Sequence, residues 1–252
     1  MRARSADPVC APSRARSAAS KSAPTTGFRY ETVGGLRAEG HLRLRHSRSD
    51  RGGFLSGWID SAGNLQKSAS PCIRDVWDDT RQRNVPAIIY AYDGNVPLYF
   101  TQDDIGEFLT CKAAAHTMVA TLLESVNVSP SEIGAFYLAG GFGTHYDLES
   151  AITVGLYPDL PREKFKILGN SSLAGAKRLL LDTGCRARLD QIRALATYVQ
   201  FGEMEKFVEN MQAARFLPHT DASRYPSVMR RLRERGKTFP PGKLAAERSG
   251  AD

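Results

Sequence analysis

The chain has 252 residues and a mass of 27.6 kDa, which allows one large or two small domains. Hydrophobic residues make up 42% and charged residues 24%, a composition that excludes a wholly disordered chain. No apolar run approaches the roughly 18 residues that cross a bilayer, and the first 50 residues contain no run typical of a signal peptide. We therefore expect no membrane partner, and the cytoplasm is the expected location.

The net charge of +7 is confined to one end of the chain. Residues 1–53 hold 11 Lys and Arg against 4 Asp and Glu, whereas residues 54–252 hold 23 against 23. The basic segment is rich in Ser, Ala and Pro, and it lacks interleaved aromatic residues, so we expect a solvated tail and no nucleic-acid partner. The predicted organisation is a low-complexity basic segment at 1–53, a compact domain at 54–217 and a basic, poorly ordered tail at 218–252.

The first strong structural signals form a hairpin followed by a long helix. Strands are predicted at 86–92 and 96–100, on either side of an Asp93-Gly94-Asn95 turn, because Asp-Gly accepts the positive φ angles of hairpin turns. Thr101 should cap a helix over 102–125, with acidic residues in its first turn. The apolar positions at helical spacing are Ile105, Phe108, Leu109, Val119, Leu122, Leu123 and Val126.

Two strand–glycine–helix units follow and indicate an α/β domain with an inner sheet. The apolar run 133–139 predicts a strand covered on both faces, and it ends at Gly140-Gly141-Phe142-Gly143. A short helix capped by Asp147 should end near residue 155. A second strand is predicted at 165–168, then Gly169-Asn170 and a helix over 173–182 capped by Ser171. Further elements expected are a strand at 198–201 and a helix at 203–211, with little packed structure beyond residue 218.

The glycine loop after the first of these strands is the best candidate for a binding site. Glycines let a backbone approach a ligand without Cβ atoms between them, and α/β folds bind ligands at the carboxyl ends of their strands. Gly169-Asn170 ends the next strand, which favours one groove shared by both turns. Each turn could also be a purely structural strand-to-helix connection.

Other candidate residues are less specific. Lys112 stands within the apolar stripe of the long helix, so its ammonium must extend to solvent, pair with a carboxylate or meet a bound anion. His116 is best explained as a packed histidine, and His145 beside the glycine loop as a loop residue. The sequence contains no Ser-His-Asp arrangement and no metal-spaced cluster, so no metal site is predicted and the catalytic residues are unknown.

Four blocks of sequence, in order and spacing, resemble the C-terminal ASKHA-type domain of the reductive activators of corrinoid proteins. The resemblance covers about residues 54–217, with a weaker match at 27–40. The blocks are 101–105 with 112–114, 137–143, 149–152 with 155–158, and 169–176.

The resemblance implies one lobe of an actin-like or sugar-kinase-like ATPase core, with a mixed sheet flanked by helices and disordered basic ends. It implies ATP with Mg²⁺ as cofactor and the restoration of Co(I) in a corrinoid protein. The cofactor-binding residues implied are Gly140, Gly141, Phe142, Gly143, Gly169, Asn170, Lys112 and Asp103.

The chain also departs from the family. The family's [2Fe-2S] cluster needs four clustered cysteines, but Cys10, Cys72, Cys111 and Cys185 lie far apart, so this chain cannot bind it. The first phosphate loop is missing too. We therefore expect a fragment that contributes the adenosine-binding lobe, with a corrinoid protein, a ferredoxin-type domain or chain and a second copy as partners. The alternatives are a non-catalytic nucleotide-binding or dimerisation module, an inert gene fragment, or part of a small-molecule kinase.

Residues 41–53 suggest a coding anomaly. The family carries an Ile-Cys-Gly-Ser-Gly-like segment where this chain has His41-Leu42-Arg43-Leu44-Arg45. Codons that encode His41 to Ser47 can be chosen so that a reading frame displaced by one base gives Ile-Cys-Asp-Ser-Gly-Ile. We hypothesise that residues 41–53 and part of 4–26 are translated out of frame, which the gene sequence would decide.

Overall fold

A computed structural model describes residues 53–79, 81–93, 96–204 and 206–237. It contains both antiparallel and parallel strand pairing with helices flanking the sheets, which confirms the predicted α/β class. The first 52 residues lie outside the described part, and so do the weaker family match at 27–40 and the segment with the frame anomaly. The candidate turn residues Gly94 and Asn95 lie outside it as well.

The N-terminal sheet has three antiparallel strands in the order β1-β2-β3. Strand β1 is Ile73–Asp78, β2 is Arg83–Asp93 and β3 is Val96–Thr101. The predicted hairpin is thus confirmed, with Asp93 paired to Val96 beside the turn. The short 3-10 helix η2, Lys67–Ala69, precedes this sheet.

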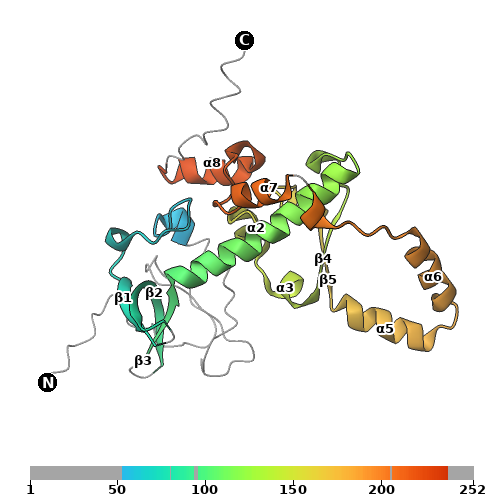
Figure 1. Ribbon diagram of the computed structural model, residues 1–252, viewed down its shortest axis with the longest axis horizontal. Helices are drawn as coiled ribbons and strands as arrows, with labels where there is room; N and C mark the ends of the chain where they lie inside the picture. Colours follow the sequence, from blue (N-terminus) through green and yellow to red (C-terminus); the bar gives the residue numbers. More distant parts are fainter. Residues whose placement is uncertain (1–52, 80, 94–95, 205, 238–252) are drawn as a thin grey trace, which may run out of the picture.

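Helix α2, Gln102–Ser125, follows β3 directly and runs through the centre of the molecule (Figure 1). Its predicted cap is confirmed: the Thr101 side chain accepts a hydrogen bond from the Asp104 amide, and the Asp104 carboxylate accepts one from the Thr101 amide. The predicted apolar stripe is correct only in its first half, where Ile105 and Leu109 are buried. In the second half the buried residues are Ala113, Thr117 and Thr121, which lie four positions apart, whereas Leu122 and Val126 are exposed.

The second sheet consists of two parallel strands, β4 at Phe136–Ala139 and β5 at Phe165–Gly169. Two short helices follow β4: α3, Gly140–His145, and α4, Leu148–Thr153. Asp147 caps α4 as predicted, since its side chain accepts a hydrogen bond from the Ser150 amide. The 3-10 helices η3, Pro130–Glu132, and η4, Arg162–Lys164, stand before the two strands.

The expectation that the 133–139 strand is covered on both faces is wrong within the described residues. Tyr137 on β4 and Leu168 on β5, which lie on the same face, expose more than half of their surface, whereas Leu138 and Phe165 on the opposite face are buried. One face of the parallel sheet therefore packs on the core while the other faces outward.

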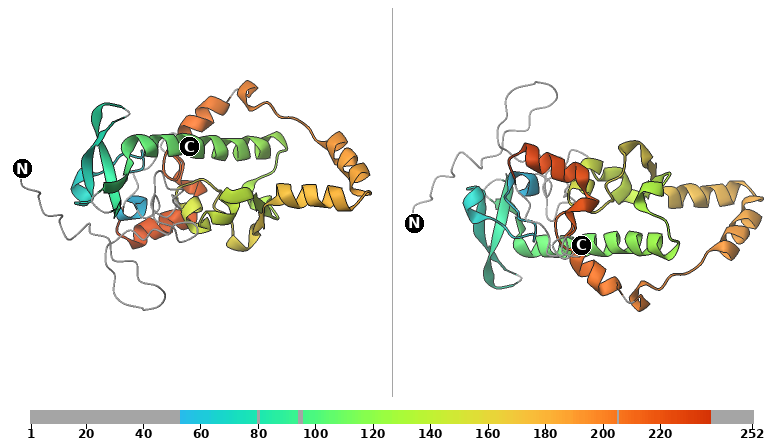
Figure 2. Two further views of the ribbon diagram at one scale, coloured as in Figure 1. Left: turned by 90° about the horizontal axis from the view of Figure 1, so that it is seen from below. Right: turned by 90° about the horizontal axis from the view of Figure 1, so that it is seen from above.

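Helices α5, Ser171–Leu181, and α6, Cys185–Leu195, project from the body as an arm (Figure 2). The predicted cap at Ser171 is wrong by one residue, because Asn170 is the N-cap and its side chain accepts a hydrogen bond from the Leu173 amide. The predicted strand at 198–201 is wrong as well. Residues 196–200 have no regular secondary structure, and the 3-10 helix η5, Phe201–Glu203, and helix α7, Phe207–Ala214, follow them.

Packed structure continues beyond Pro218, so the prediction of a poorly ordered tail from that residue is wrong for the described residues to 237. The 3-10 helix η6, Ala222–Arg224, leads into α8, Pro226–Glu234. Val228, Met229 and Leu232 of α8 are buried in the core, because the basic residues between them lie on the other side of an amphipathic helix.

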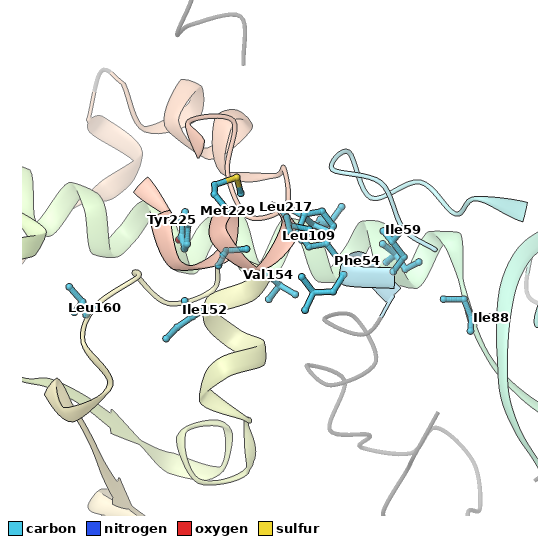
Figure 3. Packing of buried hydrophobic residues seen from close by; sticks show 14 of the residues in the cluster. Phe54, Ile59, Ile88, Leu109, Ile152, Val154, Leu160, Leu217, Tyr225 and Met229 are labelled. Carbon is cyan, nitrogen blue, oxygen red and sulfur yellow. The ribbon is translucent and has the colours of Figure 1, made fainter. Parts of the chain in front are cut away.

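The core brings together residues 54–59, α2, α4 and α8 (Figure 3). Ion pairs at its edge tie α4 to α8, since Glu149 pairs with both Arg162 and Arg231. The hydrogen bond from Arg162 lowers the pKa of Glu149 to about 2. Within the described residues, no helix is long and apolar enough to serve as a membrane span.

Candidate functional site

The two glycine turns predicted from the sequence lie side by side. Strands β4 and β5 are parallel neighbours, and Ala139 is the register partner of Gly169. The turns that follow the two strands therefore open at the same edge of the sheet, which is the edge where α/β proteins bind ligands. The expectation of adjacent turns is confirmed.

The backbone at these turns takes conformations that favour glycine. Gly140 has a φ of 77° and Gly169 a φ of 66°, both in the left-handed region. A Cβ atom added at Gly140, Gly141 or Gly169 would meet no atom of the described structure within 4 Å. No side chain covers the backbone of these turns, so a planar or anionic ligand can approach their peptide groups closely.

Two other predicted cofactor-binding residues, Gly143 and Asn170, have structural roles. A Cβ atom at Gly143 would lie 2.8 Å from the carbonyl carbon of Leu138, so this glycine lets α3 fold back onto β4. Asn170 uses its side-chain oxygen to cap α5. Phe142 and His145 belong to α3, and their side chains lie outside what the structure describes.

Lys112 meets none of the three environments considered for it. Its side chain is fully buried, and its ammonium donates to the carbonyls of Ala214, Phe216 and Pro218, the last two at 2.6 Å. These three acceptors match the three N–H bonds of the ammonium form. Burial lowers the pKa of Lys112 to about 7. With every donor in use, Lys112 fastens the segment after α7 to α2, and its contact with a nucleotide stays a prediction.

Asp103 stands at the start of α2, beside the three-stranded sheet, whereas α3 lies next to β4 and β5 (Figure 1). Its carboxylate pairs with Arg81 at 3.2 Å and Arg83 at 2.8 Å. The structure therefore brings the glycine turns and Asn170 together at one edge and holds Asp103 and Lys112 in other interactions.

A buried polar cluster beside Lys112 was missed by the sequence reasoning. Tyr225 donates to the Gly155 carbonyl at 3.2 Å, and its oxygen lies 3.1 Å from Nδ1 of His116. His219 packs against His116, with ring centroids 5.0 Å apart and ring planes tilted by 42°.

Both imidazoles in this cluster are kept neutral. Burial lowers the pKa of His116 to about 3, and the nearby charge of Lys112 lowers it further. Burial likewise lowers the pKa of His219 to about 4. Nε2 of His116 is buried and has no hydrogen-bond partner. The prediction of a packed histidine at 116 is confirmed, and no sequence signal linked it to Tyr225, which lies 109 positions away.

The described residues do not fit an iron–sulfur cluster. Cys111 and Cys185 are free cysteines on different helices. Across the described ranges, no group of three or more His, Cys, Asp or Glu side chains is arranged to hold a metal ion. We therefore derive no electron-transfer step through a cluster in this chain.

Comparisons with known proteins agree with this architecture. A family model described as the C-terminal domain of RACo, the ASKHA domain, matches residues 51–229. The corrinoid activation enzyme RamQ of Eubacterium limosum is 28% identical over 162 residues, which are 62% of this chain and 27% of RamQ. A solved structure, the reductive activator for corrinoid, iron-sulfur protein, superposes with a TM-score of 0.66 at 30% identity.

The solved activator is matched over 73% of this chain and 29% of its own. The chain thus spans less than a third of the length of both relatives. The family match includes α2, both glycine turns, the arm and the first turn of α8. This chain belongs to the family of RACo C-terminal ASKHA domains.

Proposed function

We propose that this chain contributes the adenosine-binding lobe of an ATP-dependent activator that restores Co(I) in a corrinoid protein. The observation that carries the proposal is the adjacency of Gly140 and Gly169 at the ends of two neighbouring parallel strands. The names of the matched relatives, a corrinoid activation enzyme and a reductive activator, supply the class of reaction.

The bare glycine turns fit a nucleotide. Gly140, Gly141 and Gly169 have open space where a side chain would stand, so their peptide groups can contact an adenine ring or ribose directly. Bound ATP would supply the free energy of hydrolysis to the activation reaction. The role of this chain is to hold and orient the nucleoside, while the remaining phosphate contacts come from the part of the activator that the chain does not match.

The corrinoid partner and the electron donor follow from the same comparison. A corrinoid protein would be the substrate, and a ferredoxin-type domain or chain would hold the [2Fe-2S] cluster. A second copy of the chain is a further proposed partner. The activity requires all of these components, so the chain alone should bind nucleotide and leave the cobalt of the corrinoid unreduced.

Calorimetry of the full chain with ATP and Mg²⁺ tests the nucleotide site. Gly141→Val is the informative variant, because a Cβ at Gly141 meets nothing in the fold but would occupy the proposed nucleotide space. Gly106→Val on α2 is the matched control, since Gly106 is equally open but lies away from both turns. We expect Gly141→Val to weaken binding at least tenfold and Gly106→Val to leave it unchanged. ATP binding that is equally tight in both variants would contradict the proposal.

A further inference from the structure

The buried ammonium of Lys112 is held by backbone carbonyls and by no counter-ion. It donates to the carbonyls of Ala214, Phe216 and Pro218, and the side chain is fully buried. Within the described residues no carboxylate forms an ion pair with Lys112. A buried cation without a counter-ion is costly, so the carbonyl dipoles must supply the stabilisation that a carboxylate usually gives.

The three acceptors come from alternate residues of the short segment that ends α7 and follows it. Ala214 is the last residue of α7, so its carbonyl is one of those at a helix end that have no partner in the helix. In a longer helix the amide of residue 218 would reach this carbonyl, but residue 218 is a proline and has no N–H. No backbone amide of the described residues donates to any of the three carbonyls. The segment therefore offers three free acceptors to one point.

This arrangement has the acceptor set of a cation site. Backbone carbonyls that converge on one point can replace the water around a monovalent cation, as they do in potassium channels. The negative end of the α7 dipole lies at Ala214 and favours positive charge at the same place. Three acceptors around one nitrogen also match the three N–H bonds of a primary ammonium.

We propose that the carbonyls of Ala214, Phe216 and Pro218 form a binding site for a monovalent ammonium-type cation, and that Lys112 supplies its occupant from α2. We call these three carbonyls the carbonyl cage. A free cation exchanges with the solution, whereas the Lys112 ammonium cannot leave while the fold is intact. The native chain therefore needs no free cation at this junction. This proposal is independent of the nucleotide site.

The carbonyl cage also positions its neighbours. The Pro218 carbonyl, which accepts from Lys112, lies against Gly155 in the turn after α4. His219 follows in the chain and packs on His116 of α2. An empty cage would leave three carbonyls without donors, so we expect the segment 214–219 to separate from α2 when the cation is lost.

Chemical rescue of Lys112→Ala tests the proposal. The substitution removes three methylene groups and the ammonium, which is the fragment that n-propylammonium carries. Urea unfolding is measured at pH 6, below the Lys112 pKa of about 7, in chloride salts of equal ionic strength. We expect the variant to lose at least about 1 M in its unfolding midpoint and propylammonium to restore at least about half of that loss. The restoration should saturate with concentration, as it does when a ligand binds the folded state.

Three controls separate a cation site from other effects. n-Propanol has the same carbon chain without the charge and should restore little of the loss. Lys112→Met fills the space beside the carbonyl cage with an uncharged chain and should not respond to propylammonium. Lys177→Ala removes an exposed lysine from α5, so it should unfold like the original chain in sodium chloride and in propylammonium chloride.

Trimethylamine N-oxide keeps the test decisive if Lys112→Ala does not fold in buffer. This osmolyte favours the folded state and has no N–H to donate, so the same midpoints can be measured in its presence. No restoration by propylammonium would overturn the proposal. Equal restoration by propanol would overturn it too, because the amine would then only fill a gap, and so would an equal response of Lys112→Met.

Discussion

Gly155 packs directly against the carbonyl oxygen of Pro218. A Cβ atom on Gly155 would lie 2.0 Å from that oxygen, and the residue has a φ of 79°. The turn after α4 is thereby pressed onto the segment that Lys112 fastens to α2. One backbone contact thus links the turn after α4 to the C-terminal part of the chain.

Gly155→Ala should therefore destabilise the fold. The methyl group meets backbone at an impossible distance, and the left-handed conformation alone costs about 1–2 kcal/mol for a residue with a Cβ. We expect a loss of at least about 3 kcal/mol in the free energy of unfolding, measured with urea. Gly175→Ala is the control, since Gly175 lies within α5 with open space around it, and it should be neutral or slightly stabilising. Equal stability of the two variants would refute the contact.

Lys112→Met should also destabilise the protein. It keeps the length of the side chain but leaves the carbonyls of Ala214, Phe216 and Pro218 without their donor, at a cost of about 2–4 kcal/mol. Urea unfolding measures the stability of this variant, and calorimetry measures its binding of ATP. A variant that unfolds like the original chain but no longer binds ATP would instead assign Lys112 to the nucleotide.

Because His116 and His219 are buried, we expect the free energy of unfolding to decrease in mild acid. The folded state holds His116 and His219 neutral, with pKa values of about 3 and 4, while both titrate near 6.5 in the unfolded chain. Below pH 6.5 the unfolded chain therefore binds more protons, and stability falls as pH drops toward the folded values. Each histidine contributes a slope of up to about 1.4 kcal/mol per pH unit.

Urea unfolding between pH 6.5 and 5 measures this slope, in a range where the depressed carboxylate Glu149 does not yet titrate. His116→Phe should remove about half of the pH dependence. Such a variant with the same slope as the original chain would mean that His116 is not kept neutral by burial.

Asp159 anchors the start of α8. Its carboxylate accepts hydrogen bonds from the amide and the hydroxyl of Ser227, both at 2.7 Å, and pairs with Arg162 at 2.8 Å. Asp159→Ala should cost about 2–3 kcal/mol and speed hydrogen exchange in α8. Asp190→Ala, at an exposed pair on α6, should change stability by less than about 0.5 kcal/mol. Unchanged exchange in α8 of Asp159→Ala would show that the apolar face alone holds the helix.

Local signals explain which elements could be predicted. The start of α2 followed from Thr101 and Asp104, and the start of α4 from Asp147, because a cap is a contact between residues three apart. Helix α8 was not predicted, because its basic composition is also typical of a solvated tail, although Val228 and Leu232 lie one turn apart on one face. The polarity of residues that face solvent does not exclude a buried face on the other side.

Long-range contacts explain the rest. The Lys112 ammonium donates to backbone carbonyls more than 100 positions away. Every residue has a backbone carbonyl, so the sequence does not mark these acceptors. The adjacency of the glycine turns was predictable, because parallel strands in successive strand–helix units tend to be neighbours. The uncovered face of β4 was not predictable, because an apolar run of this kind is typical both of a strand that its own chain buries and of one that a partner buries.

Nuclear magnetic resonance of the glycine amides during titration with ATP and Mg²⁺ tests the proposed site most directly. The amides of Gly140, Gly141 and Gly169 should shift together and saturate with one dissociation constant, while those of Gly106 and Gly155 stay in place. Saturable shifts confined to other residues, or no shift at concentrations where calorimetry detects binding, would contradict a nucleotide site at the paired turns.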